Sequence, residues 1–341
     1  MALLTLWACY GAPSRRTVLD VTTSPHVTCI GGAVVDRSYR IGGPVVLGSS
    51  NAATGATSFG GVARNVAENL SRLGTRAALV SVVGDDVPGR ALLDDLDRLG
   101  VDRWAVRPLA GQTTATSAAV RGPDGELVVG ASDLRAFDEI TPDRVAEPLS
   151  RVDPGAWVFA DATLPSSTQT RLATARRTRG FRLAVDTVAT SKAPRLPADL
   201  GAIDVLFTNV EEARALLADR GRALPAGPDG TVDPDAVVHA LLATGVRAVV
   251  LTLGPAGQVV GQPDVLVRTP VVPASVVDTN GVGDALVGAT LADLVRGVPL
   301  VDAVRSGAAA AALTTETASS VNPALSPALV ASRRVVPEGV G

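Results

Sequence analysis

Short and almost uniformly apolar runs recur along the chain, with room for a helix between most of them. Such runs are typical of strands that are buried on both faces of a parallel sheet. The strongest candidates are residues 27–35, 77–83, 156–160, 183–185, 205–207 and 248–253. Because strands alternate with helical patterns, we predict a three-layer α/β fold with a central, mostly parallel sheet and helices on both faces.

The clearest helical pattern lies between residues 61 and 74. Its apolar side chains repeat at helical spacing and share one stripe, made of Val62, Val66, Leu70 and Leu73. Gly74 follows the stripe and predicts a left-handed residue at the helix end. We therefore expect an amphipathic helix over this stretch.

Two stretches interrupt the alternation of strands and helices. Residues 37–58 are rich in Gly, Ser and Thr, and residues 113–132 predict two half-polar strands joined by a turn at Gly122-Pro-Asp-Gly125. Half-polar strands do not fit a buried parallel sheet. We expect both stretches to form a small β lid over the carboxyl ends of the main strands, where open α/β sheets bind ligands.

Composition narrows the class of partner. The 341 residues are 46% hydrophobic and 19% charged, which indicates a globular chain. A net charge of -3 and few aromatic residues (5 Phe, 3 Trp, 2 Tyr) argue against a nucleic-acid binder. No apolar run reaches the roughly 20 residues of a membrane span. We therefore expect a small-molecule ligand, with neither nucleic acid nor membrane as partner.

The ends of the sequence suggest how the domain is bounded, and the cysteines suggest the cellular compartment. We interpret residues 1–24 as a flexible N-terminal extension and residues 25–335 as one domain that carries the two lid segments. The histidines, His26 and His239, and the cysteines, Cys9 and Cys29, lack the spacing of a zinc site. Two unpaired thiols suit a reducing compartment, so we expect a cytoplasmic protein.

The most informative stretch runs from Asp278 to Asp284 and leads from an extended segment through a glycine turn into a helix. Gly281 and Gly283 let backbone amides converge, and the helix start adds unpaired N–H groups and the positive end of its dipole. This arrangement favours an anion. Asp284 lies beside it and could accept a proton from a hydroxyl group, which indicates phosphoryl transfer. The alternative is an ordinary capping aspartate after a glycine turn.

The sequence Asp278-Thr-Asn-Gly-Val-Gly-Asp284 resembles the Asp-Thr-x-Gly-Ala-Gly-Asp signature of the ribokinase-like kinases, the phosphofructokinase B family. The resemblance implies a ribokinase-like kinase domain over residues 25–335 that transfers the γ-phosphoryl group of ATP to a hydroxyl group. In that family Asp284 would be the catalytic base. The backbone amides of Gly281, Val282 and Gly283 would stabilise the transferred group.

Three more elements resemble family motifs and occur in family order. The pair Gly60-Gly61, followed by Asn65, resembles the substrate-binding signature. Asn209-Val-Glu-Glu212 resembles the element that holds phosphates and magnesium, which implies that Glu212 binds Mg²⁺ through water. The third element resembles the nucleotide-binding turn and contains Thr252, Gly254 and Gly257.

The same resemblance implies roles for two aspartates. Asp36, which we expect at the end of the first strand, matches the aspartate that grips sugar hydroxyls, although it could be a plain turn residue. Asp278 resembles the ligand of a monovalent cation, so K⁺ could be a further cofactor. The structural alternative for Asp278 is a buried carboxylate bonded to turn amides.

Within the family, several substrate-side stretches resemble pseudouridine kinases, namely Ser50-Asn51 and residues 131–134, 185–193 and 321–326. They contain Asn51, Asp133 and Lys192 as candidate substrate contacts. Asp133 could equally be a lid carboxylate without a role. Ala52 and Thr187 depart from the group's pattern, which usually has Pro at both positions, and this leaves the exact substrate open.

The amino-acid composition singles out Lys192 independently of any family resemblance. It is the only lysine among 31 basic side chains, so a compact ammonium is used where arginine serves elsewhere. We predict that it contacts the substrate or the transferred phosphoryl group. A chance surface lysine is the alternative.

Other activities stay open at this stage. Ribokinase-like, adenosine-type and fructose-type kinases fit the same motifs. A dinucleotide-dependent oxidoreductase fits less well, because no Gly-x-Gly-x-x-Gly follows the first strand. A catalytically silent nucleoside sensor would be expected to lose Asp284 or the glycines beside it, and all are present. Free edges of the lid strands could pair two copies in a homodimer.

Overall fold

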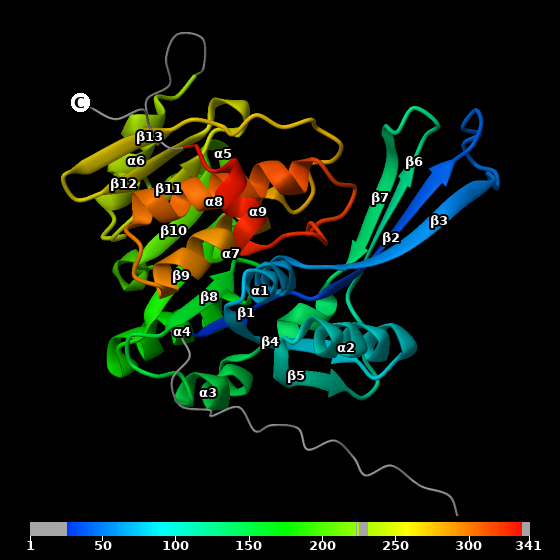
Figure 1. The fold of residues 1–341 in the computed structure, drawn as a ribbon. Helices are drawn as coiled ribbons and strands as arrows, with labels where there is room; N and C mark the ends of the chain where they lie inside the picture. Colours follow the sequence, from blue (N-terminus) through cyan, green and yellow to red (C-terminus); the bar gives the residue numbers. More distant parts are fainter. Residues whose placement is uncertain (1–25, 223, 225–230, 336–341) are drawn as a thin grey trace, which may run out of the picture.

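The computed structural model describes residues 26–222, 224 and 231–335, so the predicted extension over residues 1–24 lies outside the described residues. A nine-stranded sheet forms the centre of the molecule (Figure 1). In spatial order its strands are β13 (Val265–Thr269), β12 (Gln258–Gln262), β11 (Val249–Thr252), β10 (Val205–Asn209), β9 (Arg182–Asp186), β8 (Trp157–Asp161), β1 (His26–Ile30), β4 (Arg76–Gly84) and β5 (Asp102–Leu109). All neighbours pair in parallel except β11 with β12 and β12 with β13.

Helices cover both faces of this sheet, as expected for an α/β fold with apolar strands. One hydrophobic cluster joins the sheet to α1 (Val62–Arg72), α2 (Val87–Leu99), α7 (Val282–Val295), α8 (Leu300–Thr315) and α9 (Pro327–Arg333). A second cluster joins the opposite face to α3 (Pro142–Ser150), α4 (Ser166–Arg179), α5 (Val210–Asp219) and α6 (Pro234–Leu242). The predicted three-layer fold is confirmed.

The predicted helix over residues 61–74 is α1, and it ends as the sequence indicated. Gly74 follows it with φ 71, in the left-handed region. None of the helices in the described part of the chain combines the length and apolarity needed to cross a membrane.

The predicted strand over residues 27–35 is wrong as a single element. The chain leaves the central sheet after Ile30 because the amide of Gly32 donates to Asp161 Oδ2 at 3.0 Å. Gly31 permits this close approach, since a Cβ there would lie 2.1 Å from the same oxygen. Asp36 therefore does not end the first strand. It lies within the next strand, β2 (Val34–Ile41).

Strand β2 belongs to a separate four-stranded sheet that extends to one side of the main body (Figure 1). Its order is β3 (Ala53–Gly60), β2, β6 (Thr116–Arg121) and β7 (Leu127–Asp133). The segments 37–58 and 113–132 supply most of it. We call this sheet the lid.

The two sheets meet where the strand order of the central sheet reverses. Strand β1 lies between β4 and β8, and the chain passes from β1 into the lid and returns through α1 to β4. Ligands of open α/β sheets bind beside such a reversal, at the carboxyl ends of the strands. The fold therefore predicts a ligand site at the carboxyl ends of β1, β8, β9 and β10.

Candidate active site

The glycine turn before α7 has the predicted geometry. Gly281 caps the helix with φ 72, and a Cβ at this position would lie 1.8 Å from the carbonyl oxygen of Ser320. Only glycine fits there. The N–H groups of Val282, Gly283 and Asp284 belong to the first turn, where no intrahelical acceptor exists, and a Cβ on Gly283 would meet no atom within 4 Å. The helix start is thus open and suited to an anion.

Asp284 lies at the third position of α7 and accepts a hydrogen bond from Asn65 Nδ2 at 2.8 Å. Burial raises the pKa of Asp284 to about 7, a shift that the bond from Asn65 and the charge of Arg64 oppose and Asp161 reinforces. A carboxyl group with a pKa near neutrality is well matched to general base catalysis. The predicted base therefore has suitable surroundings.

The glycine pair brings the lid and α1 together. A Cβ on Gly60 would lie 2.0 Å from Asp36 Oδ2, and one on Gly61, which has φ 97, would lie 2.5 Å from the Gly32 carbonyl oxygen. Burial raises the pKa of Asp36 to about 6, against the charge of Arg64. The structure thus places Asp36, Gly60 and Asn65 around the start of α1.

Asp161, at the end of β8, is a site residue that the sequence reasoning missed. Its Oδ2 accepts from the amides of Gly32 at 3.0 Å and Ala63 at 3.1 Å, and its Oδ1 accepts from the amide of Thr163 at 2.9 Å. It fixes both the exit of β1 and the start of α1. An acid directly after a fully apolar strand was the only available signal.

Asn209 and Glu212 form a capping box at the start of α5. Asn209 Oδ1 accepts from the amide of Glu212 at 2.9 Å, and Glu212 Oε2 accepts from the amide of Asn209 at 3.2 Å. Thr187 Oγ1 also donates to Glu212 Oε2, at 2.5 Å. Glu212 Oε1 forms no hydrogen bond within the described residues, so it stays available to a ligand.

Asp186, at the end of β9, is a second residue the sequence reasoning did not select. Its pKa is raised well above the usual value by burial, then by the charges of Glu212 and Asp284. The carboxyl groups of Asp186, Glu212 and Asp284 therefore lie near one another, at the carboxyl ends of the central strands. No cluster of three or more His, Cys, Asp or Glu side chains in the described part of the chain has the arrangement of a metal site.

The predicted nucleotide-binding turn lies beside this region. Thr252 ends β11 and is the register partner of Asn209 in β10. Gly254 has φ 57 and Gly257 has φ 88, and a Cβ on Gly257 would lie 2.2 Å from the Thr269 carbonyl oxygen. The turn therefore requires glycine at position 257 and favours it at position 254.

The structure places Asn51 and Asp133 at different ends of the lid, and no hydrogen bond or ion pair joins either to Asp284 within the described residues. Asp133 is the register partner of Thr116, which is the register partner of Val35, so it lies at the end of the lid beside the main body. Asn51 lies in the loop between β2 and β3, at the end of the hairpin opposite Gly60, and bonds to both backbone groups of Val46 at 2.9 Å. Asp133 ends β7 and pairs with Arg135 at 2.6 Å, whose hydrogen bonds lower the pKa of Asp133 to about 2.

Lys192 lies in the loop after β9, directly before a short 3₁₀ turn, and is half-buried. Its ammonium group makes no hydrogen bond or ion pair within the described residues. Burial and then Arg195 lower its pKa, against Asp161 and Asp138. In the same loop Val188 has φ 64, and the amide of Ala189 donates to the Thr187 carbonyl at 2.7 Å. A β-branched residue in this tight turn is strained, which is common in ligand-binding loops.

Asp278 is bonded within its turn, as its structural alternative expected, but it is not fully buried. Its Oδ1 accepts from the amide of Asn280 at 2.9 Å, and its Oδ2 from Asn280 Nδ2 at 3.3 Å. The carboxyl group is half-buried and bonded within its own turn.

A central parallel sheet between two helical layers, a β lid and an anion-binding helix start beside a carboxyl group together define a ribokinase-like kinase. The sequence model for pfkB family carbohydrate kinases matches residues 24–327. The chain belongs to this family, and it is a sugar or nucleoside kinase, a phosphotransferase that acts on hydroxyl groups.

Individual relatives cover most of the chain. Pseudouridine kinase of Escherichia coli is 27% identical over 90% of this chain and 96% of its own length. Ribokinase of Arabidopsis thaliana is 27% identical over 85% of this chain and 76% of its own. The solved structure of Arabidopsis thaliana ribokinase with ribose and ATP has a TM-score of 0.78, with 23% identity over 91% of this chain and 98% of that one.

Proposed function

We propose that this kinase transfers the γ-phosphoryl group of ATP to the 5′-hydroxyl group of pseudouridine. The observation that carries the reaction is the Asn65 to Asp284 hydrogen bond beside the glycine turn of α7. The choice of pseudouridine is supported by the stretches around Asn51, Asp133 and Lys192 and by similarity to a pseudouridine kinase over almost the whole chain.

In this proposal Asp284 removes the proton from the attacking hydroxyl group. The amides of Gly281, Val282 and Gly283 face the phosphoryl group as negative charge spreads over its oxygens. Asn209, Thr252, Gly254 and Gly257 bind the nucleotide. Positioning and electrostatics then supply most of the rate enhancement.

Substrate binding would combine residues of the main body and the lid. Asp36, Gly60, Gly61 and Asn65 surround the start of α1 and would bind the sugar hydroxyl groups. Lys192, in the loop after β9, has no partner for its ammonium group within the described residues and would bind the base or the phosphoryl group. Asn51 would join only if the lid or a second copy brings it near, whereas Asp133 already lies at the end of the lid beside the main body, next to Ser132.

Magnesium fits the residues present. Glu212 would hold the metal through a water molecule, because its Oε1 forms no hydrogen bond within the described residues. The pKa of Asp186 is raised by burial and then by the charge of Glu212, which places the two carboxyl groups close together. When bound with ATP, Mg²⁺ neutralises phosphate charge. Potassium has weaker support, since Asp278 is bonded to Asn280, so its binding would require that carboxyl group to share its turn bonds.

The lid has two chemically different faces, and this supports a homodimer as part of the proposal. Tyr39, Val120 and Val129 are register partners in β2, β6 and β7, so their side chains share one face. Tyr39 is 39% exposed and Val129 is 55% exposed. Asp36 lies three residues from Tyr39 and therefore on the opposite, polar face, in a row with Ser117 and Ser132. The apolar face would pair two copies, and the polar face would cover the substrate.

The test is ATP turnover with pseudouridine, uridine, cytidine, adenosine, ribose and fructose as acceptors, combined with thermal shift for each. We expect the highest kcat/KM for pseudouridine. Preference for ribose, adenosine or fructose would assign one of the other kinase activities instead. Binding of a nucleoside without turnover would indicate a sensor.

A further inference from the structure

Arg64, in the first turn of α1, is a buried cation that no part of the mechanism above uses. Only 4% of the residue is exposed. Its Nη1 donates to the Phe59 carbonyl oxygen (3.1 Å) and to Asn65 Oδ1 (3.1 Å), and its Nη2 donates to Asp95 Oδ2 (2.6 Å). It also forms an ion pair with Glu68 Oε2 (2.5 Å), while its buried Nε has no hydrogen-bond partner among the described residues. These acceptors belong to lid strand β3, α1 and α2. Arg64 thus connects three elements at one point.

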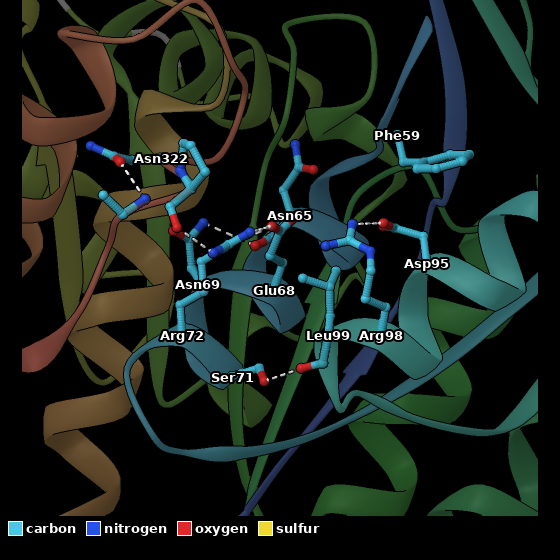
Figure 2. Close-up of polar contacts among 12 residues, drawn as sticks. Phe59, Asn65, Glu68, Asn69, Ser71, Arg72, Asp95, Arg98, Leu99 and Asn322 are labelled. Atoms are coloured by element: carbon cyan, nitrogen blue, oxygen red, sulfur yellow. Dashed lines mark hydrogen bonds and ion pairs between the residues drawn. The ribbon is translucent and has the colours of Figure 1, made fainter.

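The two acids that neutralise Arg64 are themselves held by other arginines. Arg98 pairs with Asp95, and Arg72 Nε donates to Glu68 Oε1 at 2.8 Å (Figure 2). Arg72 Nη1 also donates to the Pro323 carbonyl oxygen at 2.6 Å. A buried charge is strongly stabilised only when such partners satisfy it. The network therefore holds the Arg64 guanidinium in a fixed position and orientation.

The position of the guanidinium determines the orientation of the neighbouring amide. Asn65 Oδ1 accepts from Arg64 Nη1, while Asn65 Nδ2 donates to Asp284 Oδ2. If the amide turned over, its NH₂ group would face a guanidinium that has no acceptor, and its oxygen would face Asp284, which has no donor in the ionised form that acts as base. Both contacts would be repulsive. The amide can therefore satisfy both neighbours in one orientation only.

We propose that Arg64 is a positioning residue for phosphoryl transfer, which it serves by fixing the Asn65 amide so that its NH₂ group holds the Asp284 carboxyl group at the start of α7. This proposal rests on the proposed role of Asp284 as the base. It assigns to Arg64 no contact with substrate. Arg64 acts through Asn65, and Asp95 acts through Arg64.

The proposal has a consequence for the pH dependence of the reaction. The charged groups that influence Asp284 are Arg64 from α1, Asp161 from β8 and Asp186 from β9. The bond from Asn65 and the charge of Arg64 lower the pKa of Asp284, whereas burial and Asp161 raise it. Loss of the oriented amide removes a lowering influence. The acid limb of the kcat/KM profile then moves to higher pH.

The experiment compares Arg64→Lys with wild type, using the fastest acceptor of the panel above. Lysine keeps a positive charge beside Asp95 and Glu68 but cannot replace the three hydrogen bonds and the ion pair of Arg64 at once. We expect kcat/KM for the acceptor to fall about 10- to 100-fold, the acid limb to move to higher pH and KM for ATP to stay close to wild type. Arg90→Gln is the matched control, because Arg90 also lies on α2 but its ion pair is an exposed one with Asp85, outside the Arg64 network. It should leave the rate and the profile unchanged.

A double-mutant cycle tests whether Arg64 acts through Asn65. In an Asn65→Ala background, Arg64→Lys should have no further effect on kcat/KM or on the acid limb. Equal effects in both backgrounds, or an unchanged acid limb in Arg64→Lys, would overturn the proposal. If Arg64→Lys does not fold, Asp95→Asn replaces it in the same cycle with the same expectations.

One further variant separates this proposal from the function on which it rests. Asp284→Asn should be almost inactive. If it is inactive while Arg64→Lys behaves as wild type, only the role of Arg64 is refuted. If Asp284→Asn retains wild-type turnover, the base assignment itself is wrong and the Arg64 proposal falls with it.

Discussion

Asn65 and Asp284 are 219 residues apart in the sequence and are joined by a hydrogen bond of 2.8 Å between Nδ2 and Oδ2. The bond connects the start of α1 to the start of α7. The two family signatures, one near each end of the chain, therefore meet at a single carboxyl group. Gly288 reinforces this contact, since a Cβ there would lie 2.6 Å from Asn69 Cβ, so α7 packs closely on α1.

The glycine turn gives a stability prediction. Gly281→Ala should lower Tm, because the new Cβ would meet the Ser320 carbonyl and the residue has φ 72, a combination that we expect to cost about 1–3 kcal/mol. Gly283→Ala is the control, since its Cβ would meet open space. Calorimetry of both variants is the measurement. Equal Tm values for the two would contradict this account of the turn.

Much of the fold could be predicted from the sequence, because strands buried on both faces have an unambiguous apolar pattern. The break between β1 and β2 could not. It depends on Asp161, which lies 129 residues beyond Gly32 and binds its amide. The run from Val27 to Val35 is apolar on both sides of that break, so hydropathy alone carries no sign of it.

The same limit applies to the site. Asp284, Gly281 and Asn65 could be identified because their local motif is distinctive. Asp161, Asp186 and Arg64 could not, since their environment comes from segments far apart in the chain. A buried arginine in a helix looks like any surface arginine until its partners in other elements are known.

Lys192 supplies a prediction on specificity. Lys192→Arg should raise KM for the acceptor or lower kcat by about 10-fold or more while KM for ATP changes little, because a planar guanidinium does not replace a compact ammonium. Steady-state kinetics with each substrate varied in turn is the measurement. Wild-type kinetics in this variant would show that the side chain takes no part in binding or transfer.

Asp186 supplies a prediction on stability and pH. Its raised pKa means that the folded protein keeps this proton at a pH where the unfolded chain has lost it, so stability falls as pH rises above the unfolded value of about 3.9. Asp186→Asn removes the charge and can still accept from the Val188 amide. The variant should therefore gain Tm over wild type at about pH 8 and gain less at about pH 5. An equal loss of Tm at both values would contradict the assigned charge repulsion.

The lid gives a prediction on assembly. Val129→Asp places a charge in the middle of the exposed apolar face and should convert a dimer to a monomer. Val265→Asp is the control, because Val265 is 41% exposed in β13, an edge strand of the central sheet on the far side from the lid (Figure 1). Light scattering after gel filtration measures the mass of each. A wild-type monomer, or a dimer that survives Val129→Asp, would refute pairing through this face.

The most direct test of the central claim is the pH dependence of kcat/KM for wild type and Asp284→Asn with pseudouridine and ATP. We expect the wild-type rate to rise through an apparent pKa near 7, as the carboxyl group loses its proton. The variant should be slower by about 10²- to 10⁴-fold and lack this limb, with ATP binding retained. A variant rate close to that of wild type, with the limb intact, would contradict the assignment of Asp284 as the base.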